Sequence, residues 1–399
     1  MELRPGYKHS DVGVIPDDWE VSTLGQSCSF ENGDRSSNYP SPGSFRLSGI
    51  PFINAGHVSE GEISLSEMNY ITQEAYERLG RGKVKAGDIL FCLRGSLGKF
   101  GVVRDSFGLG AIASSLVIVR PKAAALSLDY LSCYFSSSIC FQMIDTWAGG
   151  AAQPNLGAKE LARFSIPLPP TLTEQCAIAN ALRDVDALLA TLDQMIAKKR
   201  DLKQATMQQL LTGETRLPGF SGDWEMMHLG EIAHIKTGSR NNEDKVEDGQ
   251  YPFFVRSEFV ERINSYSHDC EAILVPGEGR IGDIFHYING RFDVHQRVYA
   301  ITKFSPGISG RFVYFYLSKN FGAWAMQNTV KATVDSLRLP TFQTFEIRLP
   351  PTLDEQIAIA NALSDMDGEL CTLETRRDKI NNLKQAMMQE LLTGKTRLA

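Results

Sequence analysis

The cysteines of this chain do not have the spacing of a disulfide framework or of a metal site. Seven cysteines are scattered over 399 residues, and no two of them form a Cys-x-x-Cys pattern. A disulfide-stapled fold and a structural zinc site both need paired, closely spaced cysteines. We therefore expect free thiols, no metal and no cofactor in this chain.

Long apolar runs are absent as well. No stretch reaches the roughly 18 apolar residues of a membrane-spanning helix. The first residues, Met1–Tyr7, lack the apolar region of a signal peptide. A chain of 399 residues is too long for one small core and suits two or three domains. We expect a multidomain cytoplasmic protein.

The chain has no surplus of basic residues. It contains 41 Lys and Arg against 47 Asp and Glu, a net charge of −6. Residues 1–165 carry 15 basic and 17 acidic side chains, and residues 221–346 carry 13 and 16. Nucleic-acid-binding domains usually have a basic surface. If this chain binds DNA, we expect few phosphate contacts and weak binding by the chain alone.

Familiar catalytic motifs are also missing. The sequence has no Gly-x-Ser-x-Gly, no His-Glu-x-x-His, no P-loop and no aminomethyltransferase Asn/Asp-Pro-Pro-Tyr/Phe motif. Residues 277–282 formally fit Gly-x-Gly-x-x-Gly, but a strand-like run follows them, so we interpret them as a hairpin turn. His57, His286 and His295 are interpreted as structural or contact residues. We predict that the chain is not an enzyme by itself.

What the chain does contain is a long internal repeat. Residues 166–217 and 347–398 align without a gap at an offset of 181, and 33 of the 52 positions are identical. The segments that precede the two copies have diverged almost completely. Such a pattern indicates one task done twice in the same way and another done twice differently.

Each copy predicts one long helix with clear ends. In the first copy, Pro169 and Pro170 impose an extended approach, and Thr171 with Glu174 matches a capping box. Gly213 suits the left-handed position that ends a helix. At 1.5 Å per residue, the helix would be roughly 55–60 Å long. The second copy repeats these signals at Pro350, Pro351, Thr352, Glu355 and Gly394.

Apolar residues recur along each helix at alternating steps of four and three, with basic residues intruding late, such as Lys203 and Lys384. A narrow seam of this kind is typical of a helix that pairs with another helix. We predict that the two copies pair with each other, antiparallel. The alternative is two unrelated amphipathic helices, each lying on its own domain. The near-identical polar face argues against that alternative.

Similar lead-in segments precede the two divergent regions, with Trp19-Glu20 in one and Trp224-Glu225 in the other. The chain ends at Thr396-Arg397-Leu398-Ala399, where the first copy would continue into such a segment. The order is therefore cyclic, which predicts neighbouring termini and a pseudo-twofold arrangement. We interpret both tryptophans as core residues.

The divergent regions predict mixed, strand-rich domains. Short β-rich runs, separated by turns that contain glycine, are followed in each region by one helical stretch. The predicted strands are 89–93, 115–119, 272–275 and 297–301, and the helical stretches are 128–145 and 310–327.

Two unlike domains, each followed by a near-identical helix that begins Leu-Pro-Pro-x-x-x-Glu-Gln, resemble the specificity subunit of type I restriction–modification systems. The resemblance covers essentially the whole chain. It implies an α+β protein with two strand-rich target-recognition domains and two long helices in an antiparallel coiled coil. The implied segments are residues 1–165 (first target-recognition domain), 166–220 (central helical region), 221–346 (second target-recognition domain) and 347–399 (distal helical region).

The same resemblance implies a non-catalytic chain that reads a split, asymmetric double-stranded DNA sequence. Two copies of an adenine-N6 methyltransferase subunit, which use S-adenosylmethionine, would bind to it, and a restriction–translocase subunit would join them. The competing interpretations are a two-domain protein-binding adaptor and a methyltransferase or nuclease fragment.

Candidate base-contacting residues are polar side chains in loops, since arginine pairs with guanine and Asn or Gln with adenine. In the first domain they are Arg35, Ser36, Asn38, Arg94, Ser96, Lys99, Gln153 and Asn155. In the second they are Lys236, Ser239, Arg240, Arg256, Arg280, Gln296, Arg297, Lys331 and Thr333. Candidate partner-binding residues are Pro169, Pro170, Glu174, Gln175, Pro350, Pro351, Glu355 and Gln356, with capping of their own helix as the alternative role for the Glu-Gln pairs.

Overall fold

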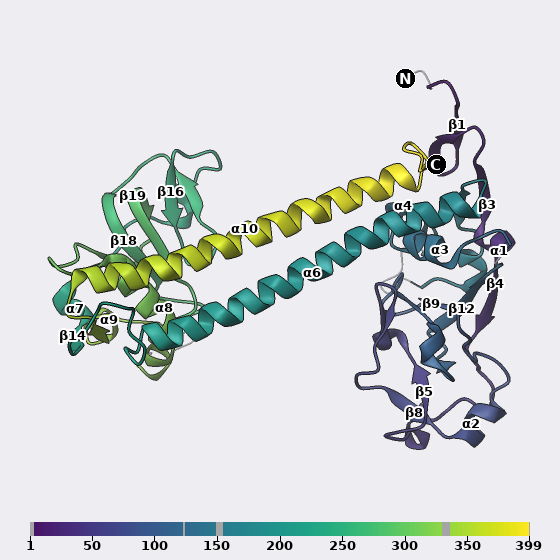
Figure 1. The fold of residues 1–399 in the computed structure, drawn as a ribbon, viewed down its shortest axis with the longest axis horizontal. Helices are drawn as coiled ribbons and strands as arrows, with labels where there is room; N and C mark the ends of the chain where they lie inside the picture. Colours follow the sequence, from purple (N-terminus) through teal and green to yellow (C-terminus); the bar gives the residue numbers. More distant parts are fainter. Residues whose placement is uncertain (1–3, 123, 149–154, 329–335, 399) are drawn as a thin grey trace. The chain divides into compact units, whose positions relative to one another are not determined.

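The computed structural model describes residues 4–122, 124–148, 155–328 and 336–398. The contacts of the chain group into two compact units, residues 1–191 with 377–399 and residues 192–376. Each unit contains one divergent domain together with part of both long helices, α6 (Leu172–Leu210) and α10 (Leu353–Leu391) (Figure 1). The four segments expected from the sequence therefore combine into two units.

The first unit is built on a four-stranded antiparallel sheet in the order β10-β9-β12-β4. A smaller sheet, β11-β5-β8, lies within the same domain. The strands of the first unit are β1 (Tyr7–Ser10), β2 (Gly13–Pro16), β3 (Glu20–Thr23), β4 (Cys28–Asn32), β5 (Ile50–Ile53), β6 (Val58–Ser59), β7 (Glu62–Ile63), β8 (Asn69–Ile71), β9 (Ile89–Cys92), β10 (Phe100–Val102), β11 (Ala111–Ile112), β12 (Leu116–Pro121) and β13 (Ser165–Leu168). Its shorter helices are α1 (Leu24–Ser27), α2 (Gln73–Arg78), α3 (Leu128–Phe135), α4 (Ser138–Trp147) and α5 (Ala158–Leu161).

The second unit contains a six-stranded sheet in the order β15-β20-β18-β19-β16-β17. All neighbours are antiparallel except β16 and β19. Its strands are β14 (Glu225–His228), β15 (His234–Thr237), β16 (Tyr251–Phe254), β17 (Glu261–Ile263), β18 (His268–Pro276), β19 (His286–Val294), β20 (Val298–Thr302) and β21 (Glu346–Leu349). Its shorter helices are α7 (Leu229–Ile232), α8 (Gly310–Gln327) and α9 (Leu339–Gln343).

The two domains repeat one plan although their sequences differ. Strands β19-β18-β20-β15 of the second correspond in order and direction to β10-β9-β12-β4 of the first. In both, the lead-in strand pairs with the strand just before the long helix, as β3 with β13 and β14 with β21. The α+β fold class and the cyclic repeat expected from the sequence are confirmed.

Parts of α6 and α10 pair antiparallel in each unit. In the first unit, Lys384 Nζ lies 2.5 Å from Asp186 Oδ1. In the second, Lys203 pairs with Asp367, which are the equivalent residues of the other copy. The basic residues that interrupt the apolar seam therefore face a carboxylate on the other helix. The predicted pairing of the two repeats is confirmed.

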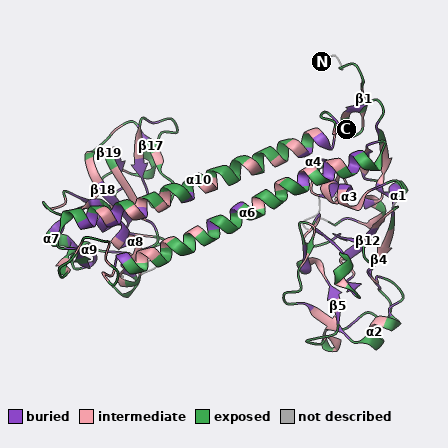
Figure 2. Ribbon diagram, in the orientation of Figure 1, coloured by how far each residue is buried: buried purple, intermediate pink, exposed green. Residues whose placement is uncertain are grey.

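Both units bury the helix ends in their cores. Ile178 and Leu182 of α6 and Met388 and Leu391 of α10 join the first core, which also holds Trp19. In the second unit the corresponding turns of both helices join the core around Phe312 and Phe321, whereas the middle turns are largely exposed (Figure 2). Trp19 is completely buried, as predicted, and Trp224 is part-buried against its core.

Some sequence expectations need correction. The predicted helix 128–145 is two helices, because the Ser137 hydroxyl caps α4 by accepting from the Cys140 amide at 3.3 Å. The capping box of the long helices forms only in part: the Thr171 hydroxyl accepts from the Glu174 amide at 3.2 Å, while the Glu174 carboxylate binds Arg397. Residues 277–282 do connect a β-hairpin, since β18 and β19 pair antiparallel.

Residues near the two ends of the chain meet in the first unit, as the cyclic order predicts. Tyr7 Oη donates to the Lys395 carbonyl oxygen at 3.2 Å, and Arg397 Nη1 lies 2.9 Å from Asp18 Oδ1. Within the described ranges, none of the helices is both long and apolar enough to cross a membrane, and the same residues contain no group of three or more potential metal ligands.

Candidate nucleic-acid interface

In the first domain, loops meet at one end of the four-stranded sheet. Arg35, after β4, donates from Nη2 to the Ser114 carbonyl oxygen at 3.4 Å. Arg94, after β9, donates from Nε to Asn155 Oδ1 at 3.0 Å. Ser96 lies in the same β9–β10 turn. The structure thus gathers four of the predicted DNA-contacting residues at one end of the sheet.

The equivalent end of the second domain gathers more of them. The backbone amide of Gln296 donates to the backbone carbonyl oxygen of Arg240 at 2.8 Å. Arg256 and Arg297 approach the carboxylate of Glu278 at 3.4 Å and 3.2 Å. Arg280, two residues further along the β18–β19 turn, pairs with Glu258 at 3.1 Å. We define the second loop cluster as Arg240, Arg256, Glu278, Arg280, Gln296 and Arg297.

The remaining predicted residues are placed elsewhere or lie outside the described ranges. Asn38 donates to the Arg78 carbonyl oxygen at 3.0 Å, beside α2, and Lys236 sits within β15 opposite Ala300. Ser36, Lys99 and Ser239 lie in the loops beside the gathered residues. Gln153, Lys331 and Thr333 fall outside the described residues. Contact of any of these residues with DNA stays a prediction.

Two acidic residues at this end of the domain, Glu278 within the second loop cluster and Asp293 beside it, are not among the residues predicted from the sequence. Glu278 bridges two arginines, and Asp293 accepts from Ser265, Ser267 and Arg240 at 2.8, 2.7 and 3.1 Å. The base readers predicted from the sequence have cationic, amide or hydroxyl side chains, and none is acidic. The glycines on either side of Glu278 were the available signal, because they mark a tight turn.

Asp293 is ionised in the folded protein. Its complete burial opposes ionisation, but hydrogen bonds from Ser267, Ser265 and the Val294 amide outweigh that effect and lower the pKa of its carboxyl group. Asp293 thereby supplies a fixed negative charge that holds Arg240.

The three histidines interpreted as structural all make bonds within the chain. His57 Nδ1 accepts from the Asn54 amide at 3.1 Å, His286 Nε2 lies 3.0 Å from the Ser257 carbonyl oxygen, and His295 Nδ1 accepts from the Arg297 amide at 3.0 Å. Burial, and then the charges of Arg256 and Arg297, lower the pKa of His295. His295 is therefore a neutral residue that shapes the loop before β20.

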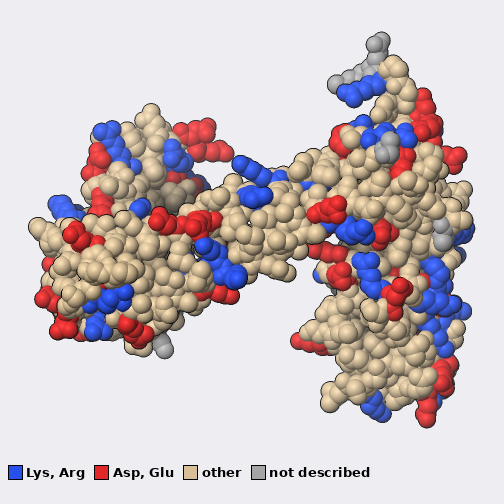
Figure 3. Space-filling model, viewed as in Figure 1, with Lys and Arg blue, Asp and Glu red and all other residues tan. Residues whose placement is uncertain are grey.

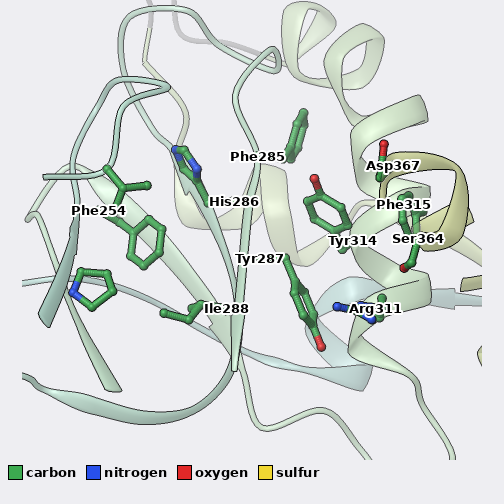
Figure 4. Close-up of a pocket in the computed structure, with 12 residues that line it drawn as sticks. Phe254, Phe285, His286, Tyr287, Ile288, Arg311, Tyr314, Phe315, Ser364 and Asp367 are labelled. Carbon is green, nitrogen blue, oxygen red and sulfur yellow. The ribbon is translucent and has the colours of Figure 1, made fainter. Parts of the chain in front are cut away.

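A separate aromatic hollow of about 500 Å³ lies in the second unit between β19 and helices α8 and α10 (Figure 4). Tyr287 Oη donates to Glu271 at 2.6 Å, and Arg311 stacks 5.0 Å from the Tyr287 ring centre. Burial raises the pKa of Tyr287 to about 12. Tyr287, Glu271 and Arg311 are already paired within the chain, so the loop cluster is the stronger candidate for reading DNA.

Charges of both signs are interspersed on the visible face of each domain (Figure 3). This agrees with the acidic balance of both segments. Since no single-sign field dominates that face, the geometry suits contacts to individual groups better than attraction to a phosphate backbone.

The start of each long helix is clamped by an arginine from the end of the other. Arg216 binds Glu355 through Nε and Nη2, at 2.5 and 2.6 Å, and lies over the Trp224 ring. Arg397 likewise binds Glu174 and lies over Trp19. Glu355 is fully buried and Glu174 is 7% exposed. We call these two groups the helix-end clamps.

The glutamines beside these carboxylates attach each domain to its helix. Gln175 Oε1 accepts from the amide of Ser127, the N-cap of α3, at 2.8 Å. Gln356 Oε1 accepts from the amide of Ser309, the N-cap of α8, at 2.9 Å. The Glu and Gln side chains proposed as partner contacts are thus occupied within the chain. A partner would have to displace these bonds to reach them, whereas Pro170 and Pro351 are exposed.

Known proteins share this architecture. The family model described as the type I restriction modification DNA specificity domain matches residues 16–199 and again residues 221–385. The MjaVIII type I restriction enzyme specificity subunit of Methanocaldococcus jannaschii is 24% identical, over 96% of this chain and 94% of its own length. The EcoDI specificity subunit of Escherichia coli is 30% identical over 43% of this chain and 37% of its own length.

Solved structures show the same fold. The S subunit of a type I restriction–modification system from M. genitalium matches with a TM-score of 0.65 and 16% identity, covering 98% of both chains. The HsdS subunit from Thermoanaerobacter tengcongensis matches with a TM-score of 0.50 and 18% identity, covering 96% of this chain and 98% of its own. Since the family model matches both halves, this chain belongs to the type I restriction–modification DNA specificity family and is a non-catalytic DNA-recognition subunit.

Proposed function

We propose that the chain reads a two-part, asymmetric DNA sequence, one half with each domain, and holds two copies of one methyltransferase subunit on it. The observation that carries this proposal is a contrast between two kinds of surface. Equivalent loop frames in the two domains carry different side chains, while six exposed positions on one face of each long helix carry the same ones. Two different DNA-reading domains, combined with two matching partner-binding surfaces, fit two unlike half-sites and two copies of one partner.

The face that contains these six positions lies opposite the pairing seam. At helical spacing on α6 it contains residues that are exposed and that recur, also exposed, on α10. We call this face the shared stripe; it consists of Asn180, Asp184, Thr191, Lys198, Leu202 and Ala205, with Asn361, Asp365, Thr372, Lys379, Leu383 and Ala386. Helix pairing does not require these identities, because the seam residues face the other way. A partner that binds twice does require them.

Two leucines mark the stripe as a contact surface. Leu202 is 52% exposed and Leu383 is 55% exposed. An exposed leucine is ordinary by itself, but its recurrence at the equivalent position of both helices is not explained by packing within the chain. The partner expected there is an adenine-N6 methyltransferase that carries its own S-adenosylmethionine, and a restriction–translocase subunit completes the larger complex.

The test is the stoichiometry of the complex with its methyltransferase. We expect wild type to bind two copies, L202E or L383E to bind one, and the double variant to bind none at a concentration tenfold above the wild-type Kd. Burying a carboxylate in place of leucine removes about 1.5–3 kcal/mol of apolar contact and adds a desolvation cost. Native mass spectrometry counts the bound subunits.

A matched control exists on the same helix. Leu188 is 40% exposed, but its equivalent on the other helix is Glu369. A twice-binding partner cannot depend on leucine there, so L188E should bind two copies. If the double variant L202E/L383E also binds two copies, the shared stripe is not the surface that binds the methyltransferase.

The competing function is a protein-binding adaptor without DNA specificity. Methylome sequencing of cells with and without the chain separates the two. The proposal expects a two-part methylated motif that depends on the chain, whereas an adaptor would leave the methylated motif unchanged.

A further inference from the structure

The loop frames of the two domains can be superimposed residue by residue from their backbone bonds. The Leu93 amide donates to the Ser115 carbonyl oxygen at 2.9 Å, and the Gly277 amide donates to that of Arg297 at 2.9 Å. The Leu156 amide donates to the Leu93 carbonyl oxygen at 3.1 Å, as the Leu337 amide does to that of Gly277 at 2.8 Å. The next residue of each turn forms the same isolated bridge, Arg94 with Asn155 and Glu278 with Ser336. Arg94 and Glu278 therefore occupy one equivalent position.

That position carries opposite charges in the two domains. Arg94 is exposed, with Ser96 and Ser115 at neighbouring frame positions. Glu278 has arginines at those two positions, Arg280 and Arg297. The frame is the same, so the difference is one of chemistry and not of placement.

Glu278 is held in a defined orientation. Its side chain is only 21% exposed and lies 3.2 Å from Arg297 and 3.4 Å from Arg256. Gly277 packs so tightly on Tyr299 that a Cβ would lie 2.8 Å from the ring, and Gly279 has a φ of +92°. This geometry fixes the turn. Glu278 also lines a polar hollow of about 400 Å³ together with Arg256, Ser257, Asn242 and Lys245.

A carboxylate at a DNA-reading surface cannot serve phosphate binding, because the two groups repel each other. It can accept a hydrogen bond from a base amino group, and in the major groove Glu pairs with cytosine N4 while Arg pairs with guanine O6 and N7. The Glu278–Arg297 pair therefore matches both halves of one G·C pair. Arg94, steadied by Asn155, matches guanine.

We propose that Arg94 and Glu278 are equivalent specificity-determining residues, with Arg94 reading guanine in one half-site and Glu278, beside Arg297, reading cytosine of a G·C pair in the other. This inference rests on the proposed two-part DNA function and names the base pair that each domain reads at this position. It also explains why one frame, used twice, selects unlike half-sites.

The experiment is motif sequencing of genomic methylation in cells that express the full chain with its methyltransferase partner. Wild type, E278Q, R94A and the control D269N are compared. Asp269 pairs with Arg291 at 3.0 Å near the opposite end of β18 from the turn, so D269N removes the same charge from the same domain. We expect E278Q to lose about tenfold of the discrimination at one G·C pair of one half-site. R94A should relax a guanine in the other half, and D269N should keep the wild-type motif.

The outcomes separate this inference from the function beneath it. If wild type yields no chain-dependent motif, the proposed function fails, and the inference falls with it. If wild type yields a two-part motif that E278Q leaves unchanged, or if E278Q and R94A alter the same half, only the inference is overturned. If E278Q abolishes methylation, competition binding of the purified complex with oligonucleotides decides. An equal loss for every base at that pair identifies Glu278 as merely structural, and a loss confined to G·C supports the assignment.

Discussion

At the residue scale, the second loop cluster depends on the carboxylate of Asp293, which no sequence motif predicted. Asp293 has no exposed surface and receives four hydrogen bonds, one of them from Arg240. Buried acceptors of this kind fix the orientation of the donors around them. Asp293 is therefore a positioning residue for Arg240, one of the predicted base readers.

The variant D293N should lower the free energy of unfolding by about 1–3 kcal/mol at pH 7, because an amide keeps only one acceptor oxygen and the donors to the other oxygen lose their partner. The folded-state pKa of Asp293 is lowered, so its stabilisation is present above the ordinary aspartate pKa of about 3.9 and is lost as pH falls through the folded value. Urea unfolding at pH 7 and at pH 3 measures this change. A gap between variant and wild type that is equally large at pH 3 would contradict it.

Glycine positions were predictable at this scale, and pairing partners were not. Gly213 and Gly394 have φ of +75° and +67°, as their place after a helix predicted. The clamp made by Arg397, Glu174 and Asp18 joins residues 223 and 379 positions apart in the chain. No local pattern contains such a pairing, because it depends on where the chain ends meet.

At the element scale, ion pairs compensate for the lysines in the helix seam. Lys203 with Asp367, and Lys384 with Asp186, are the same pair formed once in each unit. Their identity in both repeats was visible in the sequence, but only as interruptions of the apolar pattern. A slipped register would leave a part-buried lysine without a carboxylate, so the pairs favour the observed alignment.

The charge-swap series K203D, D367K and K203D/D367K tests this role. Each single variant places like charges together and should cost about 0.5–1 kcal/mol, the scale of part-exposed pairs, and the double variant should recover most of that loss. Thermal unfolding of the three variants beside wild type gives the coupling energy. Additive losses in the double variant would mean that the pair does not contribute.

At the scale of the whole molecule, the helix-end clamps close each unit. Arg216 holds the fully buried Glu355, and its removal leaves that charge unpaired. We expect R216A to cost about 3 kcal/mol, the low end for a broken buried pair, because Arg216 itself is 23% exposed.

The double variant R216A/E355Q should be more stable than R216A, since a neutral amide is easier to bury than a lone carboxylate. Hydrogen exchange at the start of α10 and thermal unfolding measure both effects. Equal stability of the two variants would show that Glu355 does not carry an unpaired charge in R216A. Exchange at the start of α6, which belongs to the other unit, serves as the internal control.

The sequence by itself determined the repeat, the ends and the seam of the long helices, and the strand-rich character of both domains. These features are local or periodic, and capping residues, glycines and apolar spacing act over a few residues. Only the tertiary structure decided which loops share a surface, that Glu174 binds Arg397 instead of completing its capping box, and that Arg94 and Glu278 are equivalent. Each of these depends on contacts between segments that lie far apart in the sequence, which no local pattern determines.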